Sequence, residues 1–517
     1  MKQELNNSRN TPAGFREVFI HLFVPDDTPP YISIFLGIIT LIALVLRLYI
    51  INNPIGYDEA YTFINFSAKS IKFVLADYHA PNNHILNSLM IWVAYRILGD
   101  HTWVVRVPAF IASVLSVPVA YVTARRFFNP ALALTASAVL AITSDLVNEA
   151  ANGRGYPMVI LFSLLLANFA GILVKKQDRW TLAAYAVTGA LGFYSIPIFL
   201  YPMAGISLWV AATYLINDEP WKDRWSKLQT FLLTCLASGI LTFVLYSPVI
   251  FFGTGLESLI ANKFVASKTW VEFTDNFATR SKLTWNSWIT YTSPLIKQTL
   301  IGGFVLSLLF YRKVSNQKLP MQVSLVLGAG IMLVLQRVAP LERMWSYLEA
   351  LYLIFAVVGL AWLIFISAKA LANEKTAMKI VSSLVLLFVI TSFIRTTVTT
   401  QNRQAVLDRT IAPEQFAGEY IAKHITAKDT VIAVSPVDLQ TAYYMKINGV
   451  SYDVFYQRDH PVQIQNALVV VRTRGDAKHK SLQSILEFYK LTSALNIEAA
   501  EMVFEYGPVQ IYSVPSK

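Results

Sequence analysis

An acidic pair, Asp58 and Glu59, follows the first long apolar run of the chain, residues 31–51. A carboxylate at a membrane boundary loses part of its hydration, so ionisable groups at such depths are commonly functional. An aspartate or glutamate held there could take a proton from a hydroxyl group as a general base. The plainer interpretation is an interfacial anchor that sits in water. The polar residues that follow favour a site.

Three of the seven histidines, His79, His84 and His101, fall in the same segment, 52–103, and His84 closes an Asn82-Asn83-His84 run. Carboxamide and imidazole groups beside a carboxylate could orient an acceptor hydroxyl, or hold a divalent cation. The histidines lack the helical spacing of a metal motif, so we expect no metal site and no required cofactor, with a divalent cation as the alternative. His101 is interpreted as a polar loop residue.

Two more polar groups stand at the ends of later apolar runs. Glu149, Arg154 and Tyr156 belong to a glycine-containing turn, which could equally be a turn with an ion pair at the membrane rim. Arg343 precedes a late apolar run beside Trp345, where its guanidinium could hold a phosphate through two parallel hydrogen bonds. The alternative for Arg343 is an interfacial Trp/Arg anchor.

The composition identifies the class of protein that must position these residues. Of 517 residues, 55% are hydrophobic and 15% are charged, against about 25% charged in soluble domains. The net charge of +11 comes from cations between apolar runs, which indicates membrane topology and not a nucleic-acid partner. The one cysteine, Cys235, excludes an intrachain disulfide and a cysteine metal site. We expect a multi-pass α-helical protein surrounded by membrane lipids, in the cell (inner) membrane.

The apolar helix predicted at 84–98 decides the topology. If it lies on the outer surface, the basic clusters between the other runs all face the inside, as the positive-inside rule requires. The N-terminus is then cytoplasmic, the C-terminus is extracytoplasmic, and the segments 52–103 (with helical pieces near 59–68 and 70–77), 149–155 and 252–297 form an outer cap. The eleven predicted spans are 31–51, 104–124, 131–148, 156–174, 180–194, 196–216, 228–251, 298–311, 320–335, 346–366 and 380–394.

The third cap segment is basic, although the positive-inside rule does not place cations on the outer face. We therefore infer an anionic ligand there. The cations of this segment are Lys263, Lys268, Arg280 and Lys282.

Residues 402–517 change in composition and alternate short apolar strands with amphipathic helices, which predicts a small soluble α/β domain. We expect strands at 430–434, 467–471, 502–506 and 509–513, and helices at 413–425, 437–447 and 480–491. The predicted organisation is a cytoplasmic segment at 1–30, a transmembrane domain at 31–395 and an extracytoplasmic domain at 402–517.

In their order and membrane side, these motifs resemble the GT-C class of integral-membrane glycosyltransferases. The resemblance is to the protein O-mannosyltransferase and lipid A aminoarabinose transferase group, over roughly 31–395. It rests on Asp58-Glu59, Asn82-Asn83-His84, the Asn-Gly-Arg-Gly-Tyr turn and Leu341-Glu342-Arg343-Met344-Trp345.

The resemblance implies a polyprenyl-phosphate sugar donor and inverting transfer of a hexosyl or pentosyl group to a glycan, lipid or protein acceptor at the outer face. Asp58 matches the catalytic acidic position, Glu59 its catalytic neighbour, and Arg343 the donor-phosphate region. Substrate contacts are expected from Asn83, His84, Glu149, Arg154 and Tyr156. Aminoarabinose transferases carry Glu-Lys-Pro where this chain has Asn83-His84-Ile85, so a lysine contact to phosphate is missing.

Two other classes of function compete with the transferase. A transporter or flippase of a lipid-linked anion would need charged or broken positions at mid-membrane, and the predicted span interiors are nearly free of charge. A receptor without enzymatic activity would leave the acidic pair unexplained. A lipid phosphate departs without a strong general acid, so a transferase can work with one carboxylate where a glycosidase needs two.

Overall fold

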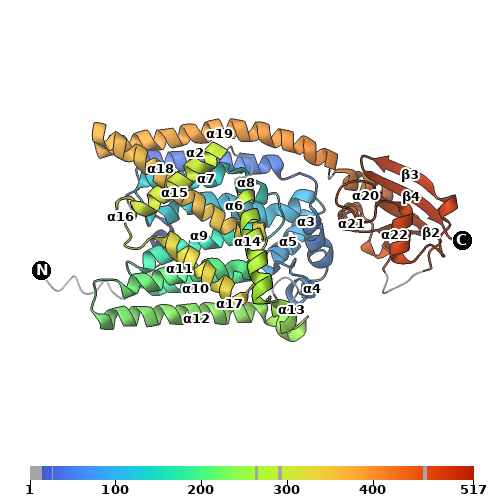
Figure 1. Cartoon of the computed structure of the whole chain (residues 1–517), viewed down its shortest axis with the longest axis horizontal. Coiled ribbons are helices and arrows are strands. Elements are labelled where there is room, and N and C mark those ends of the chain that lie inside the picture. The colour runs from blue at the N-terminus through green and yellow to red at the C-terminus, as the bar shows by residue number, and fades with distance from the viewer. Residues whose placement is uncertain (1–13, 26, 262–265, 289–293, 411, 458–462) are drawn as a thin grey trace.

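A computed structural model describes residues 14–25, 27–261, 266–288, 294–410, 412–457 and 463–517. Long helices form one bundle, and a small domain with a sheet lies at one end of it (Figure 1). This is the expected fold class of a membrane helical domain followed by a soluble α/β domain.

Each predicted span coincides with a helix, and seven helices of the described chain are long and apolar enough to cross a membrane. Four other predicted spans coincide with shorter helices, so the number of crossings stays a prediction. The seven are α2 (Pro30–Ile50), α6 (Thr102–Arg125), α9 (Tyr156–Leu173), η3 and α11 (Pro197–Phe199, Leu200–Leu215), α12 (Trp221–Phe252), η4 and α18 (Glu342–Trp345, Ser346–Leu371) and the first part of α19 (Glu374–Thr410). The shorter ones are α7 (Pro130–Ile142), α10 (Arg179–Ser195), α15 (Pro294–Leu309) and α17 (Met321–Gln336).

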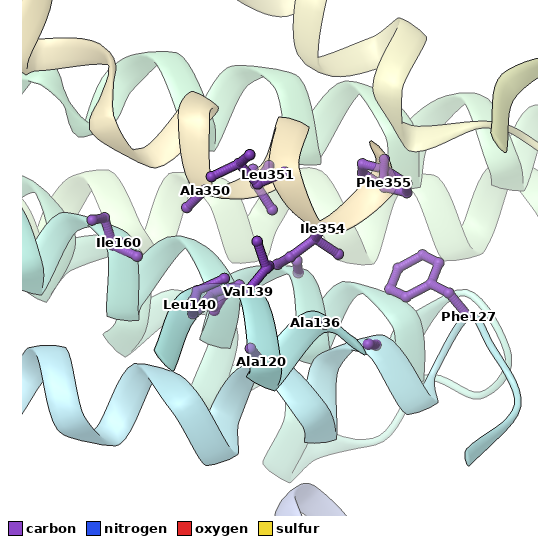
Figure 2. Close-up of a cluster of buried hydrophobic side chains, with 14 of the residues drawn as sticks. Ala120, Phe127, Ala136, Val139, Leu140, Ile160, Ala350, Leu351, Ile354 and Phe355 are labelled. Carbon is purple, nitrogen blue, oxygen red and sulfur yellow. The ribbon is translucent and has the colours of Figure 1, made fainter. Parts of the chain in front are cut away.

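One buried contact within the bundle joins α7 and α18. Val139 of α7 lies against Leu351 and Ile354 of α18, and all three are buried (Figure 2). Elsewhere two glycines allow the helix backbones to touch, since a Cβ added to Gly359 of α18 would lie 1.9 Å from the carbonyl oxygen of Gly303 on α15. Close backbone approach at small residues is how helices associate in lipid, where no hydrophobic effect drives them together.

The prediction of one continuous helix over 131–148 is wrong, because the helix breaks at Thr143. α7 ends at Ile142, Thr143 is extended, and α8 (Ser144–Glu149) follows in a new direction. The break frees carbonyl groups, and the buried guanidinium of Arg47 on α2 donates to the oxygens of Leu140 at 2.9 Å and Ala141 at 3.1 Å. The cation also suits the negative end of the α7 dipole. Arg47 therefore fixes where α8 starts, and α8 leads to Glu149.

The cap segments contain α3 (Tyr57–Thr62), the π-helix η2 (Phe63–Ser67), α4 (Ile71–Ala76), α5 (Ile85–Leu98), α13 (Leu256–Ile260) and α14 (Trp270–Ser287). These include the helical pieces expected at 59–68, 70–77 and 84–98. With 14 residues, α5 is about 21 Å long, which is too short to cross about 30 Å of hydrocarbon. The remaining short helices are α1 (Phe15–Phe23) and α16 (Tyr311–Val314).

The tail is joined to the bundle by one helix. α19 runs unbroken from Glu374 to Thr410, so the domain boundary expected at 395–402 lies within it. A helix can continue beyond the bilayer as long as its backbone hydrogen bonds are made internally.

The tail has helices α20 (Ala412–His424), α21 (Asp438–Ile447) and α22 (Leu482–Tyr489), and 3₁₀ turns η5 (Tyr452–Val454) and η6 (Ile497–Ala499). Its four strands are β1 (Asp429–Ala433), β2 (Asn466–Arg472), β3 (Glu501–Tyr506) and β4 (Val509–Pro515), in the order β1-β2-β4-β3. β1 is parallel to β2 with Val431 opposite Leu468, and the other pairs are antiparallel. All seven predicted elements of the tail are present, and each begins and ends within two residues of its predicted bounds.

Candidate active site

Asp58 lies in the first turn of α3, and its carboxylate faces groups from two distant segments. One oxygen, Oδ1, accepts a hydrogen bond from the Asn82 carboxamide at 3.2 Å, and the other accepts from the guanidinium of Arg343. Both side chains of the ion pair are partly exposed, Asp58 at 29% and Arg343 at 43%. The pair therefore stands at a surface that a ligand can reach.

The charges around Asp58 keep it ionised. Burial by itself raises the pKa of a carboxyl, but the nearby Arg154 and Arg343 charges outweigh it and hold the pKa of Asp58 below its ordinary value. Any partner that draws Arg343 away removes part of this effect, so the pKa and the basicity of Asp58 rise together.

Glu59 points the other way, into the protein. Its oxygens accept from Arg106 of α6 at 2.9 and 2.8 Å, from the amide of Gly56 at 2.8 Å and from the amide of Gly153 at 2.6 Å. Glu59 is 4% exposed and Arg106 is 1% exposed. The carboxylate that was expected to be catalytic is thus fully occupied inside the protein, which favours a role in holding α3 in place.

Arg154 holds the backbone next to Asp58. One terminal nitrogen donates to the Thr62 hydroxyl at 2.9 Å and to the Asp58 carbonyl at 3.2 Å, and the other lies 3.2 Å from Nε2 of His84. The amide of Gly155 donates to Nδ1 of His84 at 2.9 Å. The turn that carries Arg154 is therefore bound to α3 and to the start of α5.

The buried His84 ring is neutral. Burial lowers its pKa well below the ordinary value, and the charge of Arg154 acts in the same direction. Tyr156 packs edge-on against this ring with centroids 5.4 Å apart, and it interacts electrostatically with Arg343.

Asn83 does not face the other site residues. Its amide nitrogen donates to the carbonyls of Val74 at 3.0 Å and Asp77 at 2.7 Å, and the side chain is 1% exposed. The neighbouring Asn82 reaches Asp58 instead. Adjacent residues in an irregular loop point in different directions, and the sequence run alone did not distinguish them.

A cavity of about 530 Å³ opens beside Arg343, within the usual range of small-molecule sites, about 300–1,000 Å³. Glu149 lies in its wall, and burial raises the pKa of this carboxyl to about 7. The Ser346 hydroxyl is buried there and has no hydrogen-bond partner among the described residues. The cavity is lined by Asp145, Leu146, Glu149, Ser287, Trp288, Leu341, Glu342, Arg343, Ser346 and Glu349.

The other expected cap residues lie as follows. His79 bonds to Asp77 at 2.7 Å and to the Tyr61 hydroxyl at 3.1 Å, and His101 stacks on Trp103. Arg280 pairs with Glu342 at 3.1 Å. Lys263 falls outside the described residues. Within the part of the chain that is described, no three His, Cys, Asp or Glu side chains are arranged to hold a metal ion.

Two arginines inside predicted spans were overlooked in the sequence. Arg106 and Arg47 are the guanidinium groups that fix α3 and α8 respectively. An arginine within a membrane helix is costly and usually has a partner or a function, so this signal was present. Their partners are carbonyl groups, a hydroxyl and a carboxylate, most of them from other segments, which only the fold identifies.

The comparisons with known proteins agree with this architecture. Residues 81–252 match the family model described as Dolichyl-phosphate-mannose-protein mannosyltransferase. No curated protein sequence matches the chain. Among solved structures, the chain is similar to ArnT from Cupriavidus metallidurans in the apo state, at 14% identity and a TM-score of 0.52, over 93% of this chain and 97% of that one.

A second structure of the same ArnT, bound to undecaprenyl phosphate, aligns at 15% identity and a TM-score of 0.50 over 93% of this chain and 98% of that one. The alignments include the soluble tail, since they cover nearly the whole of both chains. The fold is therefore that of ArnT, and the predicted resemblance to GT-C glycosyltransferases is confirmed at the level of the fold.

Proposed function

We propose that this protein is an inverting glycosyltransferase that moves a hexosyl or pentosyl group from a polyprenyl-phosphate donor to an acceptor at the outer face of the cell membrane. The observation that carries the proposal is the Asp58–Arg343 ion pair beside an acid-lined cavity at the end of the helical bundle. A general base, a phosphate-binding cation and a pocket of suitable size are the parts that such a reaction needs.

Arg343 is the proposed ligand of the donor phosphate. It lies in η4, directly before α18. The predicted span 346–366 puts it at the membrane boundary, where the phosphate would lie when the polyprenyl chain stays in the bilayer. A phosphate that binds Arg343 competes with Asp58 for the guanidinium. Donor binding would thus release Asp58 and raise its basicity, which couples the arrival of the substrate to the activation of the base.

In the reaction, the acceptor hydroxyl attacks the anomeric carbon from the face opposite the phosphate. The bond from that carbon to the phosphate oxygen breaks, and its electron pair leaves with the lipid phosphate, while Asp58 takes the hydroxyl proton. The anomeric configuration is inverted. Arg343 stabilises the charge that develops on the phosphate, and electrostatic stabilisation of this kind usually contributes more to catalysis than any other single effect.

The cavity is the proposed site of the sugar ring. Carboxylates accept hydrogen bonds from sugar hydroxyls, and Asp145, Glu149, Glu342 and Glu349 all line the wall. Among the described residues of this wall, Arg343 is the one cation, and the phosphate would take its charge. We therefore expect a neutral or amine-bearing sugar, since the carboxylate of a uronic acid would be repelled.

Arg154 and His84 are proposed to act through Asp58 and not on the substrate directly. Arg154 holds the Asp58 carbonyl, and His84 accepts a hydrogen bond from the Gly155 amide of the turn that carries Arg154. We assign both residues to positioning the base, and Arg154 also to the positive potential around the phosphate.

The experiment is transfer by purified protein in lipid nanodiscs. Polyprenyl-phosphate sugars are supplied with a crude envelope acceptor fraction, and release of polyprenyl phosphate and the anomeric configuration of the product are measured. We expect release with a neutral or amine-bearing sugar, an inverted product, and loss of both with Asp58→Asn. Net retention of configuration, or an equal rate with Asp58→Asn, would contradict the proposal.

A further inference from the structure

We propose that the C-terminal domain positions the catalytic segment through two side chains of α21, Gln440 and Tyr444. The role is that of a positioning element and rests on the proposed function, in which Asp58 is the base. Both residues lie more than 380 positions from the residue whose backbone they hold.

That residue is Ile55, three residues before Asp58. Its amide donates to the Tyr444 hydroxyl at 2.8 Å, and its carbonyl accepts from the Gln440 carboxamide at 2.8 Å. Ile55 is 0% exposed, Tyr444 2% and Gln440 6%. Buried polar groups of the backbone need partners, and here the tail supplies both.

The rest of the loop is held from inside the membrane domain. Arg106 donates to the carbonyls of Asn53 at 2.5 Å and Pro54 at 2.9 Å, and the amide of Gly56 donates to Glu59. Two parts of the protein therefore hold the loop 53–56. The membrane domain binds the backbone of Asn53, Pro54 and Gly56, and the tail binds the backbone of Ile55.

Apolar contacts continue from the tail into this segment. The rings of Tyr443 on α21 and Phe63 just after α3 meet edge-on with centroids 5.2 Å apart. Ile55, Ala60 and Phe63 belong to one buried cluster with side chains of the tail. The Tyr57 hydroxyl, next to Asp58, interacts with the carboxylate of Asp438 at the start of α21.

With these contacts, the tail can support the reaction without supplying a catalytic residue. Asp58 must lie within hydrogen-bond reach of the acceptor hydroxyl, and a displacement of about 1 Å can reduce turnover by about 100-fold. Without the tail, the membrane domain alone would hold the loop before α3, and the backbone of Ile55 would be free to move. Gln440 and Tyr444 remove that freedom.

The first test is hydrogen exchange of the full-length protein in nanodiscs, which needs no substrate. Tyr444→Phe removes the hydroxyl that binds Ile55, and Tyr489→Phe is the matched control, because its hydroxyl donates to the carbonyl of Ala433 at 2.9 Å within the tail. We expect exchange in residues 53–62 to become roughly 5- to 100-fold faster in Tyr444→Phe, as an unpaired buried amide implies, and to stay unchanged in Tyr489→Phe. Equal exchange in the two variants would overturn the proposal.

The second test is sugar transfer by the double variant Gln440→Met/Tyr444→Phe. We expect kcat to fall roughly 10- to 100-fold with unchanged donor affinity, while Tyr489→Phe keeps its rate. In the Asp58→Asn background the same double change should cost less than about 2-fold, because the base to be positioned is gone. A full additional loss there would show a general structural effect instead and contradict the proposal. If the unaltered protein transfers no sugar, the proposed function fails, and the exchange experiment still decides the positioning.

Discussion

The guanidinium of Arg343 donates to the carboxylate of Asp58 and joins two residues that are 285 positions apart. The pair combines the phosphate-binding cation and the base of the proposed reaction in one contact. Each residue therefore affects the availability of the other, and single substitutions should have unequal effects on binding and turnover.

Asp58→Asn tests the base. Turnover should fall roughly 10²- to 10⁴-fold, the usual contribution of general base catalysis. Donor affinity should stay the same or rise, because Arg343 loses a competing carboxylate. The measurements are the single-turnover rate and donor titration. Asp275→Asn makes the same change at an exposed site on α14 and should keep the rate. A well-folded Asp58→Asn protein with the original rate would exclude Asp58 as the base.

Arg343→Ala tests the phosphate contact. Donor affinity should fall by about 1.5–3 kcal/mol, the typical contribution of a hydrogen bond to a charged group. Arg343→Lys should restore part of this, because an ammonium cannot make two parallel contacts. Lys282→Ala removes an exposed cation of the same cap segment and controls for general attraction of anions. Equal losses in Arg343→Ala and Lys282→Ala would argue against a specific site.

Glu59→Gln should act on stability. It leaves Arg106 buried without its charge partner, and breaking a buried ion pair costs about 3–5 kcal/mol. A thermal unfolding scan in detergent measures the loss, and Glu257→Gln, an exposed change on α13, should leave the melting temperature in place. If Glu59→Gln melts normally but loses turnover, Glu59 belongs to the reaction and not to the support of α3.

Glu149 should make stability depend on pH. Its pKa is about 7 in the folded protein against an ordinary 4.5, so the folded state binds the proton more tightly. The contribution of Glu149 to the free energy of unfolding is fully present below pH 4.5 and is lost as the pH rises through 7. Glu149→Gln should therefore raise the melting temperature relative to the unaltered protein at about pH 8 and much less at about pH 5. The exposed Glu498→Gln should show no such trend. A constant difference across this pH range would contradict the raised pKa.

The topology prediction can be checked with an impermeant thiol reagent in intact cells, after Cys235→Ser. A cysteine at the exposed Lys176, between α9 and α10, should be shielded, and one at the exposed Lys478 in the tail should react. The reason is that cations between spans stay inside. Labelling at Lys176 from outside would reverse the predicted orientation.

Local patterns in the sequence were enough for the class of fold and for part of the site. Long apolar runs require helices in lipid because the backbone must bond to itself, so the helices at each span followed directly. Alternating apolar positions likewise predicted the four strands of the tail. Asp58, Arg154 and Arg343 stood out as charged residues at the ends of such runs.

Tertiary structure alone decided what these residues touch. Asp58 faces Arg343, whereas its neighbour Glu59 faces Arg106. This difference depends on the orientation of α3 and cannot be read from two adjacent acidic residues in the sequence. The break at Thr143 depends on the guanidinium of Arg47 arriving from another helix. The hold of Gln440 on Ile55 joins positions 385 apart. Local patterns report burial and helix ends, whereas side-chain partners are selected by long-range packing, which no window of sequence contains.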